Sequence, residues 1–358
     1  MPVADVISVF FGCVIVAAIL FDIFASVIVP RPIRSIVMVS ALLRRYTWRM
    51  WRFAFIGVQP AQRREVLLGI FAPFNMVLLF CGWVFGLILG FGLIFFGLRS
   101  GIHPPAQDLG TAVYYAGTSL LTIGYGDFVA DSGVTRFFSI AAAASGLATI
   151  AVVLTFLFSL FASFQRREVF VVTLDARGSS PASGLALLET HATLDLVHDL
   201  PRLFQEAQTW CAEVLDTHLA YPVLCYFRSS HVDVSWISAL GALLDAATLA
   251  IAATEDIPKG QAFLMHSVGA HLTFDLAKYF GLLAEPNVLV ERSEFQAARE
   301  RLRSVGYALA GEEQSWETFC RLRSEYAGTL NNMARYWAIT PAQWIGDRSP
   351  LGSSRHEA

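Results

Sequence analysis

Thr122-Ile123-Gly124-Tyr125-Gly126-Asp127 is the stretch that decides the fold class of this chain. Gly124 and Gly126 alternate with residues that carry side chains, and glycine adopts left-handed backbone conformations without a Cβ clash. Long apolar segments precede and follow the stretch. Irregular backbone at membrane depth is tolerated only where it is buried in protein or lines a cavity. The context therefore predicts a cavity-lining loop in a membrane protein.

The composition divides the chain into a membrane half and a soluble half. Of its 358 residues 55% are hydrophobic, and the mean hydropathy is +0.53. Charged residues are sparse up to about Phe164 and frequent afterwards. Three apolar segments, at about 6–29, 74–98 and 134–164, meet the roughly 20 residues that a helix needs to cross a bilayer. The first lacks the flanks of a signal peptide, so we expect a retained helix. Pro73 predicts a kink near the start of the second.

The distribution of arginine predicts the orientation. The connection between the first two spans carries eight arginines: Arg31, Arg34, Arg44, Arg45, Arg49, Arg52, Arg63 and Arg64. The positive-inside rule places this connection in the cytosol. The N-terminus and the 122–127 stretch then face the outside of the plasma membrane, and the C-terminal half lies in the cytosol.

The 122–127 stretch closely resembles the selectivity filter of potassium channels, a ring of four TVGYG loops. The resemblance implies an all-α membrane protein with three transmembrane helices, a re-entrant pore helix at 107–121 and a helical cytosolic domain. It also implies a homotetramer, because each chain supplies one loop. The backbone carbonyls that would hold K⁺ belong to Thr122, Ile123, Gly124 and Tyr125, with Gly126 at the outer mouth. Conduction requires no covalent chemistry, so we expect neither an enzyme nor an organic cofactor.

Further residues acquire roles from the same resemblance. Tyr114 and Tyr115 fall where related channels place an aromatic cuff, and interfacial packing is an equal alternative. Asp127 is expected to accept a hydrogen bond from Tyr115, and Tyr125 to wedge the loop against its own pore helix. Thr118 stands where some potassium channels carry a carboxylate that couples to inactivation.

The third span is expected to line the cavity below the filter. Gly146 matches the hinge glycine of the inner helix, and close packing against the pore helix is the rival explanation for it. Ile150, Leu154 and Phe158 lie at helical spacing and are expected to form a hydrophobic gate.

Three features outside the filter lead to separate expectations. Asp22, near the cytosolic end of the first span, is expected to pair with an arginine of the following connection. Glycines at 82, 86 and 90 form a small-residue stripe for helix packing. The pattern of residues 34–52 favours a helix that lies on the inner leaflet over a voltage sensor. Four basic residues of this helix are expected to contact anionic lipid headgroups: Arg44, Arg45, Arg49 and Arg52.

Five regions follow from these patterns: a transmembrane helix (1–30), a cytosolic amphipathic segment (31–64), a pore domain (65–166), a helical cytosolic domain (167–345) and a loose tail (346–358). The cytosolic domain is expected to hold helices at 184–200, 202–219, 232–255, 260–284, 292–309 and 313–337. The breaks fall at Pro201, Pro222, Pro258 and Pro286. The apolar stretch 234–253 is expected to be a buried core helix, because Asp245 in its middle would be costly in lipid.

The cytosolic half offers no recognisable chemistry. It has no glycine-rich nucleotide motif and no nucleophile motif. Its histidines, among them His191 and His198, are scattered, and the five cysteines are expected to be free thiols. We expect no nucleic-acid partner and leave open an unknown cytosolic ligand.

Two further stretches resemble a family of bacterial membrane proteins known as ion-channel or potassium-channel family proteins. They are Leu174-Asp175-Ala176-Arg177 with the Ser/Pro loop after it, and Tyr221-Pro222-Val223-Leu224 through Arg228, His231, Ser235 and Trp236 to Leu244-Asp245. Two alternatives to a potassium channel stay open at this point. One is a cation channel of poor selectivity on the same scaffold, and the other is a membrane sensor or scaffold with a vestigial pore.

Overall fold

The computed structural model describes residues 2–29, 38–177, 183–229, 235–339, 342 and 344. The expected loose tail, His231 and most of the Ser/Pro loop lie outside the described residues. Contacts divide the chain into two units. We call residues 1–51 and 70–161 the membrane unit, and residues 52–69 and 162–358 the C-terminal unit.

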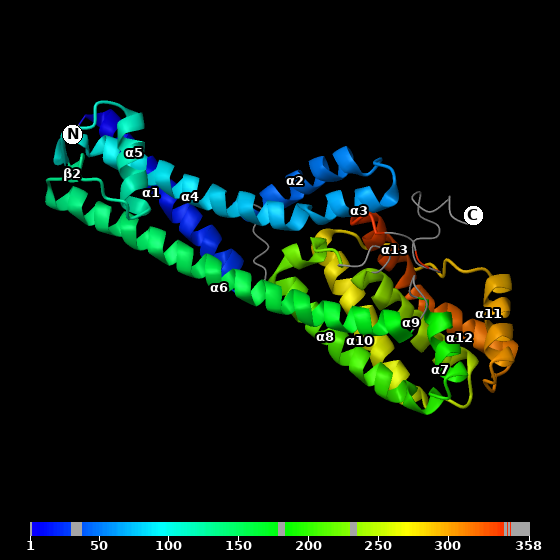
Figure 1. Cartoon of the computed structure of the whole chain (residues 1–358). Helices are drawn as coiled ribbons and strands as arrows, with labels where there is room; N and C mark the ends of the chain where they lie inside the picture. Colours follow the sequence, from blue (N-terminus) through cyan, green and yellow to red (C-terminus); the bar gives the residue numbers. More distant parts are fainter. Residues whose placement is uncertain are drawn as a thin grey trace. The chain divides into compact units, whose positions relative to one another are not determined.

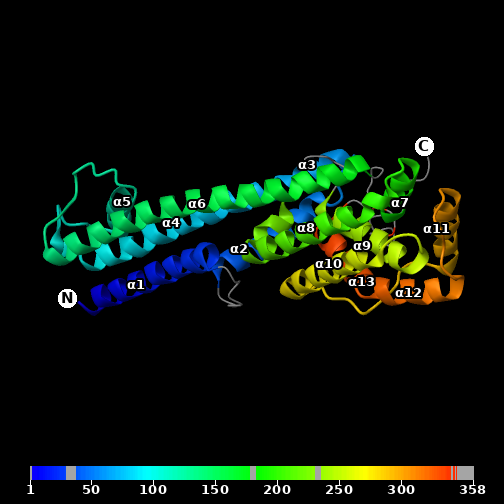
Figure 2. The same cartoon turned by 90° about the horizontal axis from the view of Figure 1, so that it is seen from below.

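The membrane unit is built around two long helices and the first part of a third, which lie side by side in Figures 1 and 2. They are α1 (Val3–Ile23), which runs on into a π-helical turn (Phe24–Ile28), α4 (Phe71–Gly97) and α6 (Gly133–Arg177). The short helix α5 (Leu109–Leu120) lies between α4 and α6 in the chain. A 3₁₀ turn (Arg99–Gly101) leads into β1 (Ile102–His103), which pairs antiparallel with β2 (Val129–Ala130). This pair ties together the two connections that flank α5.

Four helical stretches of the described residues are long and apolar enough to cross a membrane: Val3–Val27, Ala61–Gly97, Gly133–Arg177 and Trp236–Ala253. The first three correspond to the three predicted spans, although the first ends two residues and the second one residue before the predicted end. The fourth is 94% buried inside the protein, so the prediction of a buried core helix is confirmed there.

Small residues bring α1 and α4 into close contact. A Cβ atom added to Gly12 would lie 2.6 Å from the Gly90 carbonyl oxygen, and one added to Gly86 would lie 2.9 Å from the Ile19 side chain. The packing role predicted for the glycine stripe is confirmed at Gly86 and Gly90. A Cβ atom added to Gly82 would meet no atom within 4 Å, so this glycine faces open space.

The helices around Pro73 begin earlier than the predicted span. Helix α3 (Ala61–Gly69) ends one turn before Pro73, and α4 begins at Phe71. A proline ring clashes with the carbonyl four residues before it, which here is that of Gly69. The interruption therefore lies at Ile70, and Pro73 itself sits in the first turn of α4.

Helix α6 is longer than the predicted third span. Arg166, Arg167 and Glu168 were expected to end the helix, but it continues to Arg177. These three charged residues mark the end of lipid contact, but their backbone hydrogen bonds continue the helix. Arg167 is buried, and its guanidinium donates to Glu168 and to the carbonyls of Leu224 and Phe227.

The expected pairing of Asp22 with an arginine is not what the described residues show. Its carboxylate accepts hydrogen bonds from the Ser40 hydroxyl (3.1 Å) and from the Trp83 indole nitrogen (2.8 Å). Ser40 stands at the start of α2 (Val39–Phe55), and its backbone N–H also points at Asp22 (3.4 Å). Asp22 thus joins the first turn of α2 to α1 and α4.

Helix α2 runs along α4 in the opposite direction. Asn75 donates to Thr47 (2.9 Å), and the rings of Trp51 and Phe74 stack 5.1 Å apart. Trp48 is buried against Phe71. Helix α2 is therefore packed along the start of α4, and its place on the inner leaflet stays a prediction.

The C-terminal unit is helical throughout its described part, as predicted. Its helices besides α3 and the end of α6 are α7 (Gly184–Thr193), α8 (Leu200–Ala220), α9 (Trp236–Ala253), α10 (Lys259–Phe280), α11 (Arg292–Ser304), α12 (Glu312–Ser324) and α13 (Ala327–Tyr336). Two 3₁₀ turns, Val197–Asp199 and Pro222–Tyr226, separate neighbouring helices.

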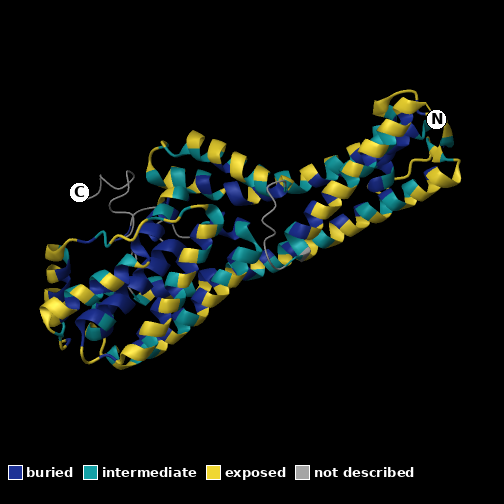
Figure 3. Cartoon of the chain, turned by 180° about the vertical axis from the view of Figure 1, so that it is seen from behind, coloured by how far each residue is buried: buried dark blue, intermediate teal, exposed yellow. Residues whose placement is uncertain are grey.

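Helix α9 forms the centre of this unit and appears almost entirely as buried ribbon in Figure 3. Asp245 is paired with Arg323, and it also accepts a hydrogen bond from the Tyr326 hydroxyl (2.5 Å). A buried charge of this kind is retained only with a partner, which explains how an aspartate fits in a core helix.

Two predicted helices end early or divide. The predicted helix 184–200 stops at Thr193, because the chain turns through a left-handed residue at Asp195 (φ 58°). The predicted helix 313–337 is two helices, α12 and α13, separated at Glu325 and Tyr326.

Candidate functional site

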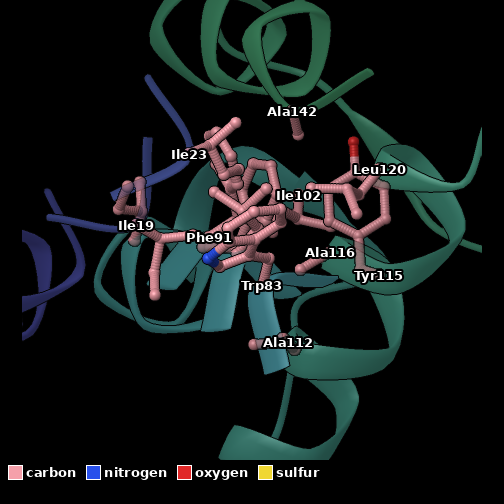
Figure 4. Packing of buried hydrophobic residues seen from close by; sticks show 14 residues of the cluster. Ile19, Ile23, Trp83, Phe91, Ile102, Ala112, Tyr115, Ala116, Leu120 and Ala142 are labelled. Carbon is pink, nitrogen blue, oxygen red and sulfur yellow. The ribbon is translucent and has the colours of Figure 1, made fainter. Parts of the chain in front are cut away.

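Helix α5 supports the 122–127 loop. It begins at Asp108, whose carboxylate accepts a hydrogen bond from the Thr111 backbone N–H (2.7 Å). The buried positions Ala112, Ala116 and Leu120 recur every four residues and pack into the hydrophobic cluster drawn in Figure 4. The bounds agree with the predicted helix at 107–121 to within two residues.

The backbone after α5 turns its amides toward the end of the helix. The N–H groups of Ile123 and Gly124 both donate to the Thr118 carbonyl (2.8 and 3.4 Å), and that of Thr122 donates to Ser119 (3.1 Å). In a trans peptide the carbonyl points opposite to the N–H of the next residue. The carbonyls of residues 121–123 therefore point away from α5 and leave one row of acceptors on the other side of the loop.

Both glycines of the loop have the left-handed conformation that the sequence predicts, with φ of 59° at Gly124 and 81° at Gly126. Thr122 also has positive φ (55°), which the sequence does not signal. This conformation costs a non-glycine residue about 1 kcal/mol or more. Three left-handed residues thus alternate with ordinary ones along the loop.

The loop is exposed in a single chain. Residues 121–127 are all exposed, and Tyr125 is 70% accessible. Most of the Tyr125 side chain is thus left uncovered by its own chain, and its role as a wedge stays a prediction.

The two tyrosines of α5 have different partners. The Tyr115 hydroxyl lies 2.7 Å from the Ser139 hydroxyl of α6, and its ring is buried against Phe95. Tyr114, not Tyr115, is the tyrosine of α5 that interacts with Asp127. The expected partner of Asp127 therefore changes: Tyr115 faces the helices, and its neighbour Tyr114 faces the loop.

Gly146 lies against the end of α5. A Cβ atom added there would come within 1.9 Å of the Leu120 carbonyl oxygen. This contact supports close packing, the rival to the hinge, and α6 passes through Gly146 as unbroken helix. Thr118, one turn before the loop, is buried and donates its hydroxyl to the Tyr115 carbonyl (3.0 Å).

The three residues expected to form a gate lie on one exposed face of α6. Ile150 and Leu154 are each 51% accessible, and Phe158 is 76% accessible. Their spacing of four residues places them in one row. A single chain thus presents an uncovered apolar row below the loop.

The four arginines expected at lipid headgroups divide into two pairs. Arg45 and Arg49 are exposed on α2, beside Tyr46 and Met50. Arg52 instead donates to the Arg335 carbonyl (3.2 Å) within the C-terminal unit, and Arg44 is half-buried. One nitrogen of the Arg52 guanidinium is thus bound to protein, and the contact of these arginines with lipid stays a prediction.

Within the described ranges, no group of three His, Cys, Asp or Glu side chains is arranged to hold a metal ion. His191 is buried, with its Nδ1 atom 2.7 Å from the Leu187 carbonyl oxygen.

Comparison with known proteins gives one family and one relative. Residues 78–163 match the family model described as "Ion channel". The chain is also similar to the "Uncharacterized membrane protein YdjJ" of Bacillus subtilis (strain 168), with 25% identity over 137 residues, which cover 38% of this chain and 39% of that protein. No solved structure gives a match.

The family match covers most of α4, all of α5 and the loop, and α6 as far as residue 163. It confirms the resemblance of this part of the chain to pore-loop channels. The protein is thus an all-α, multi-pass membrane protein that contains an ion-channel domain.

Proposed function

We propose that this chain is the subunit of a homotetrameric, potassium-selective channel of the plasma membrane. Four copies of the 122–127 loop would surround one axis. Cages of carbonyl oxygens from Thr122, Ile123, Gly124 and Tyr125 would bind dehydrated K⁺, with Gly126 at the outer mouth. The observation that carries the proposal is the row of carbonyls turned away from α5.

The chemistry of the loop favours a cation without tightly bound water. Carbonyl oxygens replace the hydration shell of K⁺ in filters of this kind, and the Thr122 hydroxyl adds a further ring of oxygens. The last carbonyls of α5 carry the negative end of the helix dipole, which stabilises a cation nearby. A Tyr125 side chain that is exposed in one chain is available to pack against a neighbouring α5 in the tetramer.

The exposed row of Ile150, Leu154 and Phe158 suits the inner part of the same pore. Four such rows would narrow an aqueous cavity into an apolar constriction, which closes a pore by excluding water. Gly146 would keep α6 in contact with α5 at the base of the filter. The C-terminal unit would gate the pore or hold the tetramer together, with or without a cytosolic ligand.

The orientation follows from the arginines of the connection between the first two spans. The N-terminus and the filter would lie outside, and the C-terminal unit in the cytosol. Arg45 and Arg49 would be the residues that meet anionic headgroups of the inner leaflet.

Potassium flux into liposomes holding the purified protein tests the proposal, beside the Gly124→Ala and Gly133→Ala variants. A Cβ atom meets nothing within 4 Å at either position, but only Gly124 has positive φ. We expect the wild type and Gly133→Ala to take up K⁺ in preference to Na⁺, and Gly124→Ala to lose uptake by a factor of ten or more.

Other outcomes point to the alternatives. Equal uptake of the two ions would favour the weakly selective cation channel. Absence of uptake by a correctly tetrameric protein, at any voltage or pH, would favour a sensor or scaffold that conducts nothing.

A further inference from the structure

We infer that the end of α6, residues 165–176, is an assembly surface that packs against the same segment of other copies of this chain, as a parallel four-helix bundle on the cytosolic side of the pore. The inference rests on the proposed tetramer. It concerns a surface outside the filter and the gate.

This segment of α6 has one covered face and one uncovered face. Val171 and Leu174 are buried in the C-terminal unit. On the other face Val169 is 67% accessible and Val172 is 43% accessible, and Gln165 and Ala176 are also exposed. We call Gln165, Val169, Val172 and Ala176 the α6 stripe.

Lipid does not account for the exposed valines. Residues 133–164 of α6 already extend over about 48 Å at 1.5 Å per residue, beyond the hydrocarbon core of about 30 Å. The stripe follows Arg166, Arg167 and Glu168, whose charges mark the end of lipid contact. Two valines on one face of the helix thus project into water, and a protein partner on that face would remove their apolar surface from water.

The stripe lies on the same face of α6 as the gate row, which is our name for Ile150, Leu154 and Phe158. Three of its four members lie eleven positions after apolar residues of the same uninterrupted helix: Gln165 after Leu154, Val169 after Phe158, and Val172 after Phe161. Eleven residues make slightly more than three full turns, so such a repeat keeps one face of a helix toward a common axis with a slight right-handed supercoil. The face that would surround the pore therefore continues into the stripe.

The charge pattern favours identical partners. Copies related by rotation about one axis bring the same residue into contact with itself, so a charge at the axis would repel its own copies. The stripe holds no ionisable residue. At about 100° per residue, Arg166 lies about 90° round the helix from the middle of the stripe and about 60° from Val169, so it flanks the proposed contact.

Cysteine cross-linking tests the inference with Val172→Cys and the neighbouring Thr173→Cys as a matched control. Both side chains are exposed in one chain, but Thr173 is turned by about 100° from Val172. The full-length protein, reconstituted in liposomes, would be oxidised with copper-phenanthroline and compared with the wild type, which has its own five cysteines. A disulfide forms only between cysteines with Cα atoms within about 7 Å.

We expect Val172→Cys to give at least fivefold more covalent dimer than Thr173→Cys or the wild type. The same samples would be tested for K⁺ flux and, by native mass spectrometry, for tetramers. A tetrameric, conducting protein in which the two variants cross-link equally would overturn the inference and leave the proposed channel in place. A wild-type protein that is neither tetrameric nor conducting would overturn the proposed function and the inference with it.

Discussion

At the scale of single residues, Gly146 is where the packing of the pore is tightest. A methyl group in place of its hydrogen would lie 1.9 Å from the Leu120 carbonyl oxygen, and both partners belong to helices that cannot yield easily. Overpacking of this kind costs about 1–3 kcal/mol. We expect Gly146→Ala to lower the melting temperature of the detergent-solubilised protein and to reduce K⁺ flux, since Leu120 lies two residues before the proposed filter.

Gly82→Ala is the matched control, because a Cβ atom there meets nothing within 4 Å. It should leave both measurements unchanged. If Gly146→Ala were as stable as the wild type and altered only channel opening, the hinge would be the better explanation and the packing role would be wrong.

His218 predicts how stability depends on pH. Its ring is fully buried, and the Arg167 guanidinium lies 3.0 Å from its Nε2 atom. Burial first, and the Arg167 charge second, hold the pKa of His218 well below its usual value of 6.5. Burial also lowers the pKa of His266.

The sign of the effect follows from proton binding. Below about pH 6.5 the unfolded chain binds a proton at each histidine that the folded protein does not bind, so folding is weakened as the pH falls. Each histidine contributes up to about 1.4 kcal/mol per pH unit. We expect the melting temperature to fall between about pH 7.5 and pH 5.5, and His218→Gln, which keeps an acceptor for Arg167, to reduce that slope. An unchanged slope in the variant would show that His218 is not the group responsible.

The roles of the two neighbouring tyrosines show the limit of prediction at this scale. The sequence places Tyr114 and Tyr115 beside the filter, but it cannot say which of two adjacent helical residues faces the loop. That choice depends on the rotation of α5, which is set by the burial of Ala112, Ala116 and Leu120. The four-residue spacing of these small and apolar residues was available as a signal.

At the scale of helices, Asp22 joins three elements, and its bond with Trp83 can be measured. We expect Trp83→Phe to destabilise the protein by about 1 kcal/mol, since it removes the indole donor from a buried carboxylate and leaves an aromatic ring in place. The same change made in an Asp22→Ala background should cost distinctly less. Equal costs in the two backgrounds, measured by thermal melting, would show that the Asp22–Trp83 contact contributes nothing.

Hydropathy predicts the spanning helices well and their ends poorly. The apolar runs mark α1, α4 and the first part of α6, because lipid selects for long uncharged segments. The same signal stops at Arg166, and so it misses the continuation of α6, where Arg167 is buried through hydrogen bonds to Glu168 and to main-chain carbonyls. Hydrogen-bond partners that come from distant parts of the chain cannot be predicted from the local hydropathy pattern.

At the scale of the whole molecule, several surfaces of a single chain are exposed, and the sequence does not say what would cover them. Tyr125, the row of Ile150, Leu154 and Phe158, and the α6 stripe are all exposed. Further copies of the chain around one axis would cover each of them in the proposed tetramer. A single sequence contains the loop but not the neighbours that complete a four-fold site. The motif therefore predicts the chemistry of the site, while contacts between subunits remain proposals.

The reversal potential of the purified protein in a planar bilayer, with K⁺ on one side and Na⁺ on the other, tests the central claim most directly. A filter of four carbonyl-lined loops predicts a reversal potential displaced far toward the value at which K⁺ alone carries the current. The displacement should disappear, or the current with it, in Gly124→Ala but not in Gly133→Ala. A reversal potential near zero in the wild type would contradict potassium selectivity and would instead indicate a weakly selective cation channel.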